Sequence, residues 1–266
     1  MLPALPLITL LTDFGTKDHF VASMKGVILR IHPQLSIIDL SHDITAHRIE
    51  EAAHFMQSCY RCFPDGTVHI VVVDPGVGTC RRALVVQAGR QYFLAPDNGV
   101  LTSVLAEHPQ SEIREIKDFQ HRFQPWGSTF EGRDLFAPAA AWLAKGMAFE
   151  SFGPPVETPV RIPGHEPMWR GEQFVGEIVA VDRFGNLISN ITRRHLEEAR
   201  AVIAGRSLKI RISTYTVERL VGCYSEGDSG RPFALINSNG LVEIFVKEGS
   251  AASTMGVGRG QRVDLL

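Results

Sequence analysis

The stretch TVHIVVVDPGVG, residues 67–78, decides the fold class of this chain. Residues 68–73 are apolar and mostly β-branched apart from one histidine, and Asp74-Pro75-Gly76 ends the run at once. A run of this length with turn residues behind it is typical of a buried strand. Because polar residues follow the strand directly, they are candidates for a site at its carboxyl end.

Strand-like and helix-like segments alternate on both sides of this run. The predicted strands are 7–11, 35–40, 67–73, 83–87, 91–95 and 112–116, and the predicted helices are 18–31, 48–59, 98–107 and 134–145. Alternation of this kind predicts an α/β domain with a mostly parallel central sheet. We assign it to residues 1–152.

The pattern changes after a proline-rich stretch. Residues 153–171 contain five prolines, a composition typical of a linker. Beyond it, short apolar segments alternate with turn residues, and we predict strands at 176–181, 187–190, 208–212, 232–236, 241–246 and 262–265. This half, residues 172–266, indicates an antiparallel β-barrel-like domain.

The composition excludes several classes of protein. Of the 266 residues, 44% are hydrophobic and 21% charged, which is ordinary for a globular enzyme. The net charge of −2 and the lack of a basic tract argue against nucleic-acid or membrane partners. No apolar run approaches the roughly 20 residues of a membrane-spanning helix, and residues 1–11 do not resemble a signal peptide.

Cysteine and histidine spacing gives no support for a metal centre. Cys59 and Cys62 form a lone CxxC without a second pair, so we expect reduced thiols and a cytoplasmic protein. The spacings among His42, His47 and His54 do not place three ligands on one face. A GxSxG motif for serine hydrolysis is also missing.

Polar residues follow three predicted strands of the first half. Asp13, Asp74 and Asp97 each come after a strand, and such loops share one edge of an open α/β sheet. An aspartate here is often only a turn or cap residue. Arg81 or Arg82, beyond the glycines at 76 and 78, is able to return toward Asp74 as an ion partner.

The second half contains a comparable cluster at the end of a predicted strand. Asp182, Phe184 and Asn186 supply a carboxylate, an aromatic ring and a carboxamide within five residues. The ring is suited to stacking on a planar base, the carboxamide to an adenine edge, and the carboxylate to an ammonium group. The alternative is a plain β-turn with glycine at its tight position.

Together these motifs resemble the S-adenosyl-L-methionine (SAM) hydrolases, or SAM hydroxide adenosyltransferases, relatives of the fluorinase and chlorinase enzymes. The matching pieces run in order along nearly the whole chain: residues 12–15, 24–26, 74–79 with Arg81, 95–99, 129–130, 132–134, 182–190 and 248–252. The resemblance implies an α/β domain joined to a β-barrel. It also implies a homotrimer that binds SAM between the amino-terminal domain of one subunit and the carboxyl-terminal domain of its neighbour.

The resemblance also assigns substrate contacts. Asp13 is expected to hold the ribose hydroxyls, Phe184 and Asn186 to bind adenine with the Ala251-Ala252 backbone nearby, and Asp182 to hold the methionine ammonium. SAM is the substrate, and neither a cofactor, a metal nor a covalent intermediate is expected. The implied reaction is in-line attack of water, as hydroxide, at ribose C5′, which releases methionine and leaves adenosine.

The chain departs from the family at one catalytic position. An Asp, an Arg and a His act on the water in the hydrolases; Asp74 and Arg81 match the first two, but Glu131 stands where the histidine is expected. Glu131 has three candidate roles: a general base, a partner that holds Arg81 or Arg133, or the mark of a protein that binds SAM or adenosine without turnover.

Three other functions fit the residues less well. Two carboxylates at 74 and 131 repel halide ions, which argues against a halide transferase. A purely structural trimer leaves the aspartates at strand ends unexplained. A SAM-dependent methyltransferase lacks support because a glycine-rich first turn does not follow residues 7–11.

Overall fold

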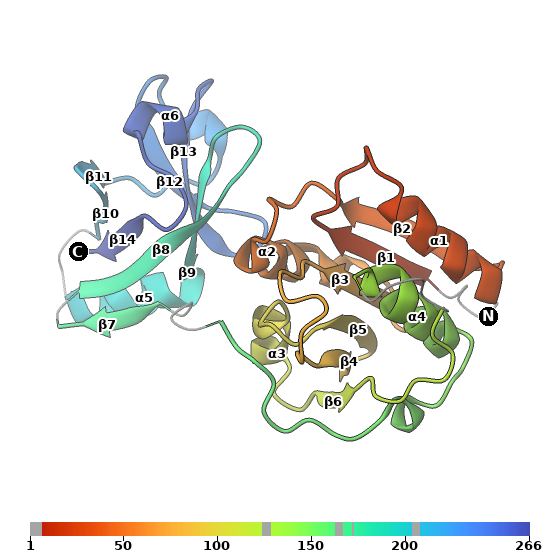
Figure 1. Ribbon diagram of the computed structural model, residues 1–266. Helices are drawn as coiled ribbons and strands as arrows, with labels where there is room; N and C mark the ends of the chain where they lie inside the picture. Colours follow the sequence, from red (N-terminus) through yellow and green to blue (C-terminus); the bar gives the residue numbers. More distant parts are fainter. Residues whose placement is uncertain (1–6, 124–128, 163–166, 172, 204–207) are drawn as a thin grey trace. The chain divides into compact units, whose positions relative to one another are not determined.

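The computed structural model describes residues 7–123, 129–162, 167–171, 173–203 and 208–266 (Figure 1). The chain divides into two compact units, residues 1–162 and 163–266, here called unit 1 and unit 2. In the described part of the chain, no helix combines the length and the apolar character needed to cross a lipid bilayer.

Unit 1 is built on one mixed sheet. Its strands are β1 (Leu7–Thr12), β2 (Ser36–Ser41), β3 (Val68–Val72), β4 (Ala83–Ala88), β5 (Gln91–Pro96) and β6 (Glu112–Glu115), in the order β2-β1-β3-β5-β4-β6. Strands β2, β1, β3 and β5 are parallel to one another, and β4 runs antiparallel between β5 and β6. The predicted mostly parallel sheet is therefore confirmed.

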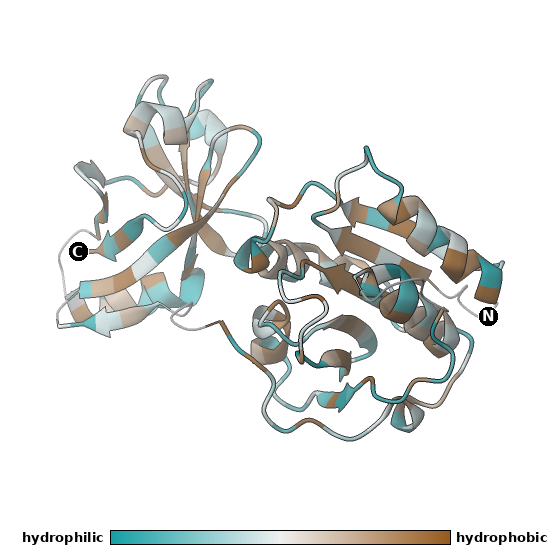
Figure 2. Cartoon of the chain, viewed as in Figure 1, coloured by the Kyte–Doolittle hydropathy of each residue, from teal (hydrophilic) through white to brown (hydrophobic). Residues whose placement is uncertain are grey.

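Helices cover both faces of this sheet. The helices of unit 1 are α1 (Phe20–Ile31), α2 (Ile49–Cys59), α3 (Thr102–Glu107) and α4 (Ala137–Ala144), with a π-helical turn η2 (Gly132–Phe136) before α4 and short 3₁₀ turns η1 (Tyr60–Cys62) and η3 (Phe149–Phe152). One core lies between the sheet and α1, η2 and α4, and a second lies between the sheet and α2 and α3. Figure 2 shows the apolar central strands that these helices cover.

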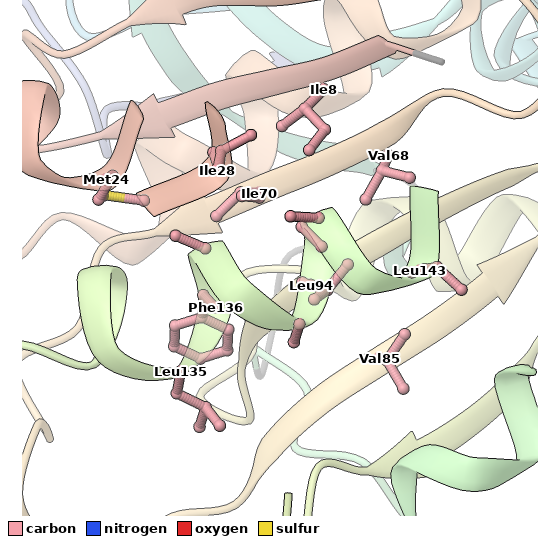
Figure 3. Packing of buried hydrophobic residues seen from close by; sticks show 14 of the residues in the cluster. Ile8, Met24, Ile28, Val68, Ile70, Val85, Leu94, Leu135, Phe136 and Leu143 are labelled. Carbon is pink, nitrogen blue, oxygen red and sulfur yellow. The ribbon is translucent and has the colours of Figure 1, made fainter. Parts of the chain in front are cut away.

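Alternation along β3 explains the two cores. Val68 and Ile70 point toward α1 and α4. They belong to the same core as Ile28 of α1 and Leu94 of the neighbouring strand β5 (Figure 3). Val71 belongs to the opposite core. Because successive side chains of a strand point to opposite faces, a strand covered on both sides has to be apolar throughout.

Two predicted helices of unit 1 begin later or differently than expected. The helix predicted from residue 98 starts at Thr102, because Gly99 has a φ of 97° and the Asn98 side chain accepts the Val100 N–H at 3.2 Å. The helix predicted over 134–145 begins with the π-helical turn η2 at Gly132.

The proline-rich segment, residues 153–171, is divided between the two units. Val156 donates its N–H to the Ile113 carbonyl at 2.9 Å, and Glu115 donates to the Pro154 carbonyl at 3.0 Å. Residues 154–162 thus lie within unit 1, and the boundary between the units falls at residues 162 and 163, inside the predicted linker.

Unit 2 consists of one strongly curved antiparallel sheet. Its strands are β7 (Met168–Arg170), β8 (Gln173–Val181), β9 (Leu187–Thr192), β10 (Ile210–Ile212), β11 (Tyr215–Val217), β12 (Pro232–Ile236), β13 (Leu241–Val246) and β14 (Arg262–Leu265). The order is β11-β10-β14-β8-β9-β13-β12, with β7 beside β8. Just after β11, the Val221 N–H donates to the Ala234 carbonyl of β12 at 2.8 Å, so the sheet nearly closes on itself. The predicted β-barrel-like fold is confirmed.

Two helices of unit 2 were not predicted. They are α5 (Arg193–Ile203) and α6 (Ala251–Met255), and a 3₁₀ turn η4 (Tyr224–Glu226) lies between β11 and β12. Helix α5 places Leu196 and Ala199 in the barrel core, three residues apart on one face. Helix α6 is short and is capped by Ser250, whose side chain accepts the Ser253 N–H at 3.1 Å.

Candidate active site

The carboxyl ends of the parallel strands bring the predicted loops of unit 1 to one edge of the sheet. Strands β1, β3 and β5 are neighbours, so Asp13, Asp74 and Asp97 follow side by side along that edge. Because β4 runs the other way, Arg81 and Arg82 lie at the same edge, before its first residue. The Asn98 side chain joins two of the loops by donating to the Val73 carbonyl at 2.8 Å.

Arg81 is the arginine that contacts Asp74. Its Nε lies 3.0 Å from Oδ1 and 2.9 Å from Oδ2 of Asp74, and its Nη2 also donates to Oδ2. The Gly76 N–H donates to Asp74 Oδ1 at 3.2 Å. Both side chains are largely buried, at 5% exposed for Asp74 and 11% for Arg81, so solvent screens this ion pair only weakly.

Arg82 has a different partner. Its Nε donates to Asp97 Oδ2 at 2.7 Å, and its Nη2 donates to the Thr158 carbonyl at 2.8 Å. The other Asp97 oxygen accepts the Val160 N–H at 2.8 Å. Both oxygens of Asp97 are therefore engaged in holding the end of unit 1 in place, and Asp97 acts as a structural brace at this edge.

Glu131 completes a cluster around Arg81. Its Oε2 accepts from Arg81 Nη2, and its Oε1 accepts from Arg122 Nη2 at 3.3 Å. Arg81 thus bridges the two carboxylates of Asp74 and Glu131. Arg133, the other arginine considered as a partner of Glu131, pairs instead with Asp134 at 2.6 and 2.9 Å.

The start of η2 positions Glu131. Gly132 follows it in close packing, since a Cβ there would lie 3.1 Å from the Phe130 ring and 3.2 Å from Met24 Sδ. The Phe130 ring packs edge-on against Phe14 and Phe20, with centroids 5.8 and 5.0 Å apart. This aromatic cluster ties the η2 turn to the loop after β1 and to α1, which directs Glu131 toward the sheet edge.

The two carboxylates keep Arg81 charged. Burial acts to lower the pKa of the Arg81 guanidinium, but the hydrogen bonds and charges of Asp74 and Glu131 outweigh it and raise that pKa. The guanidinium also lies over the Phe136 ring, 5.7 Å from its centroid. A fixed cation between two carboxylates is suited to orienting a small polar molecule such as water.

Asp13 stays accessible at the same edge. Its Oδ2 accepts the His47 N–H at 2.9 Å, and His47 adopts a left-handed backbone with a φ of 67°. The Gly15 N–H donates to the His42 carbonyl at 2.8 Å, so the loops after β1 and β2 hold each other. The Asp13 side chain is half-buried, so part of it remains accessible to a ligand.

Unit 2 carries a pocket of about 800 Å³ around the second predicted cluster. Its lining residues are Asp182, Phe184, Asn186, Tyr224, Ser225, Phe245, Val246, Lys247, Glu248 and Gly249. A volume of this size suits a small organic ligand. Phe184 is 76% exposed, so its ring is available for stacking.

Asp182 shapes the loop between β8 and β9. Its Oδ1 accepts the N–H groups of Phe184 at 2.9 Å and Asn186 at 2.8 Å, and its Oδ2 accepts from Asn186 Nδ2 at 3.0 Å. Gly185, with a φ of 82°, gives its carbonyl to the Ala252 N–H at 2.9 Å. Residues 182–186 thus form the β-turn that the sequence left as an alternative and also line the pocket, and Ala251 and Ala252 lie beside them.

Tyr224 and Phe245 are pocket residues that sequence reasoning missed. Their rings meet edge-on with centroids 5.0 Å apart, and the Tyr224 hydroxyl donates to Glu243 at 2.7 Å. Burial, together with that hydrogen bond, raises the pKa of Tyr224 to about 12. A lone tyrosine in a 3₁₀ turn about 40 residues beyond Phe184 carries no sequence signal. Arg122 of unit 1 was also missed, because it too stands outside any sequence motif.

The cysteines and the histidines that the structure describes are not gathered into a centre. All four cysteines are free. Among the described residues, no three His, Cys, Asp or Glu side chains group in a way suited to a metal ion. His42 is buried and hydrogen-bonds through Nδ1 to Thr12 at 2.8 Å, which gives it a structural role in the sheet.

Comparison with known proteins gives consistent matches along the chain. The family profile described as SAM hydroxide adenosyltransferase N-terminal domain matches residues 8–153, and the corresponding C-terminal domain profile matches residues 176–264. An (R)-S-adenosyl-L-methionine hydrolase from Thermus thermophilus is 35% identical, covering 96% of this chain and 98% of the relative. A fluorinase from an Actinoplanes species is 29% identical over 90% of both chains.

A solved structure is similar in fold as well as in sequence. The crystal structure of an uncharacterized conserved protein from Thermotoga maritima matches with a TM-score of 0.88 and 34% identity, covering 97% of this chain and 99% of that one. The similarity therefore spans both units.

Proposed function

The chain belongs to the SAM hydroxide adenosyltransferase family, and from this premise we propose that it hydrolyses SAM to adenosine and L-methionine. The observation that carries the proposal is the cluster at the sheet edge, in which Arg81 bridges Asp74 and Glu131. These are the positions at which the resemblance expects the groups that act on water.

The proposed reaction is a single displacement at ribose C5′. A water oxygen forms the new bond to C5′ while the C5′–S bond breaks. The electron pair of the C5′–S bond stays on sulfur, so methionine leaves as a neutral thioether. The water loses one proton to a carboxylate of the cluster or to solvent. Asp74 and Arg81 orient the water. The entropy cost of bringing water and SAM together is then met on binding, which lowers the barrier of the displacement.

Electrostatics favours attack by water at this charged cluster. The positive charge leaves the sulfonium of SAM as the C5′–S bond breaks, and it develops on the attacking water oxygen until that water loses a proton. Two carboxylates near the attacking water stabilise a partial positive charge on it as the proton leaves.

For Glu131, the contact with Arg81 supports the role of a holding partner. A carboxylate that accepts from two guanidiniums has a fixed plane, and it fixes Arg81 in turn. We propose that Asp74 and Arg81 act on the water directly and that Glu131 keeps Arg81 aligned. The protein is then an active hydrolase without the family's histidine.

We propose that SAM is bound by residues of unit 1 and by residues of unit 2. The pocket lining in unit 2 supports Phe184 and Asn186 as adenine contacts, with Asp182 in the same lining and the 251–252 backbone nearby. In unit 1 we propose the partly exposed Asp13 as the ribose contact. We propose a homotrimer in which the two sets of residues come from neighbouring subunits. The free cysteines agree with a reducing compartment, and we propose the cytoplasm as the place of action.

The test uses purified protein, SAM and water enriched in ¹⁸O. Hydrolysis at C5′ predicts equal amounts of adenosine and methionine, one ¹⁸O in adenosine and none in methionine. Because L-methionine already defines the α-carbon, the (R) in the relative's name refers to sulfur, so both sulfonium epimers are assayed separately. Asp74→Ala is the blank.

Three outcomes would replace the proposal. Binding of SAM or adenosine without any product would leave a binding protein built on this fold. A 5′-halogenated 5′-deoxyadenosine formed when chloride or fluoride is added would indicate a halide transferase. Release of 5′-methylthioadenosine with ¹⁸O-labelled homoserine, or of S-adenosylhomocysteine with labelled methanol, would show attack at a different carbon.

A further inference from the structure

We propose that Arg122 is a positioning residue for this site, holding Glu131 so that Glu131 in turn holds Arg81. The inference rests on the proposed hydrolysis. Arg122 Nη2 lies 3.3 Å from Glu131 Oε1, while Arg81 occupies the other oxygen, Oε2. Each oxygen of the Glu131 carboxylate therefore has a guanidinium of its own.

The charges of the cluster require a second cation. Asp74 and Glu131 carry two negative charges, and Arg81 alone supplies one positive charge to them. Arg122 brings the cluster to neutrality. With Arg122 removed, two carboxylates share a single guanidinium, and the Glu131 carboxylate competes with Asp74 for it.

The backbone around Arg122 is anchored to the element that carries Glu131. The N–H of Phe123 donates to the Asp134 carbonyl in η2 at 3.1 Å. On the other side, the His121 ring packs on Trp142 of α4 with centroids 4.4 Å apart. Arg122 lies between these two anchors, so its reach to Glu131 is set by the packing of its neighbours.

This arrangement predicts a defined kinetic effect. The Arg122 side chain is about 41% exposed and does not belong to the proposed substrate contacts, so its loss is expected to leave binding of SAM nearly unchanged. Misalignment of Arg81, by contrast, acts on the attacking water. Arg122→Ala is therefore expected to lower kcat about 10-fold while KM changes less than about twofold.

The experiment is a double-mutant cycle with matched controls. Arg122→Ala, Arg122→Lys, Glu131→Gln and the Arg122→Ala/Glu131→Gln double variant are assayed for adenosine release, with thermal midpoints recorded alongside. Arg30→Ala is the charge control, because Arg30 and Arg122 line one cavity of about 710 Å³ in unit 1. Lysine is expected to recover part of the lost kcat, and Arg30→Ala is expected to match the wild type.

The cycle decides the inference. If Arg122 acts through Glu131, removing it in the Glu131→Gln background adds little, so the effects of the two single variants do not multiply. Multiplying effects, or an Arg122→Ala enzyme with wild-type kcat, would overturn the inference and leave the proposed hydrolysis intact. Failure of the wild type to release adenosine would overturn both. A kcat loss that follows a drop in thermal midpoint, without rescue by lysine, would show a merely structural role.

Discussion

Glu131 stands where the resemblance implies a histidine, and its contacts indicate how a carboxylate is accommodated there. A carboxylate accepts from Arg81 without regard to pH in the neutral range, whereas an imidazole does so only when neutral. A carboxylate also needs a counter-charge that a neutral imidazole does not need, and Arg122 supplies one.

This difference predicts the behaviour of Glu131→His. The variant is expected to keep activity within about fivefold of the wild type at pH 8, where the imidazole is neutral and accepts from Arg81. Below about pH 6.5 the imidazole becomes charged and repels Arg81, so the variant is expected to lose activity where the wild type does not. The measurement is kcat against pH from 5.5 to 9. Profiles of the same shape would contradict the holding role of Glu131.

His69 makes a second prediction at the scale of one residue. Its ring is fully buried in β3, stacked on Phe93 at 4.8 Å and bonded through Nδ1 to Thr9 at 2.7 Å. Burial lowers the pKa of His69 from about 6.5 to about 4, and the Gln91 side chain opposes that shift. The unfolded chain therefore binds a proton in a range of pH where the folded protein does not.

The sign of the pH effect follows. The stability contributed by neutral His69 is complete above about pH 6.5 and is lost as the pH falls from 6.5 toward 4. At pH 5 the loss from this residue is about 2 kcal/mol. Urea unfolding at pH 7.5 and 5 measures it, with His69→Gln as the control for carboxylates that titrate nearby. Equal pH dependence in both proteins would contradict the assignment.

Sequence reasoning reached the residues that follow strands and matched motifs, and it missed those brought in by packing alone. A contact between Asp74 and one of the two following arginines was predictable because a glycine-containing loop returns the chain toward the strand end. The loop left the choice between Arg81 and Arg82 open, and the structure shows Arg81 in contact with Asp74. Arg122 and Tyr224 were not predictable, since each meets its site through tertiary contacts with no periodic pattern or turn signal.

Among the elements, the loop from β8 to β9 connects folding to binding most directly. Gly185 has a φ of 82°, and a Cβ there would lie 2.0 Å from Ser250 Oγ and 2.6 Å from Ser250 Cβ. Such contacts force the loop away from the start of α6. The loop carries Phe184 and Asn186, so any shift of it changes the pocket.

Gly185→Ala is therefore expected to destabilise the protein by about 2 kcal/mol and to weaken binding of adenosine at least about 10-fold. Gly240→Ala is the matched control, because Gly240 also has a positive φ, of 76°, but a Cβ there meets nothing within 4 Å. Urea unfolding and calorimetric titration with adenosine measure the two effects. Equal losses in both variants would show that backbone strain, and not the close approach to Ser250, governs this loop.

The elements themselves were predictable where one periodic signal dominated. Strands β3 and β13 are largely apolar runs, each with one polar residue inside and polar residues after it, and the structure has them close to the predicted bounds. Helix α5 was missed because its segment is rich in charged residues and buries a single narrow face. The π-helical turn η2 before α4 was missed because the close packing that accompanies it, around Gly132, is tertiary.

At the scale of the whole molecule, the two units keep separate cores. The hydrophobic clusters of unit 1 draw on residues 8–156, and those of unit 2 draw on residues 174–265. The two sets of proposed contacts divide in the same way, with Asp74 and Arg81 in one unit and Phe184 and Asn186 in the other. A site that needs both sets can be completed within one subunit or between two.

Subunit mixing distinguishes these arrangements. Asp74→Ala damages the contribution of unit 1 and Phe184→Ala that of unit 2, and each variant alone is expected to be nearly inactive at SAM concentrations well below KM. If neighbouring subunits of a trimer share each site, unfolding and refolding the two variants together in equal amounts restores intact sites. Half of the subunits carry an intact unit 1 and the other half carry an intact unit 2. A site formed by two neighbouring subunits receives both intact units in about one quarter of cases (1/2 × 1/2), so about one quarter of the wild-type activity is expected. Activity no higher than the mean of the two parents would place both contributions within one subunit, and light scattering on the same samples would report whether the assembly is a trimer.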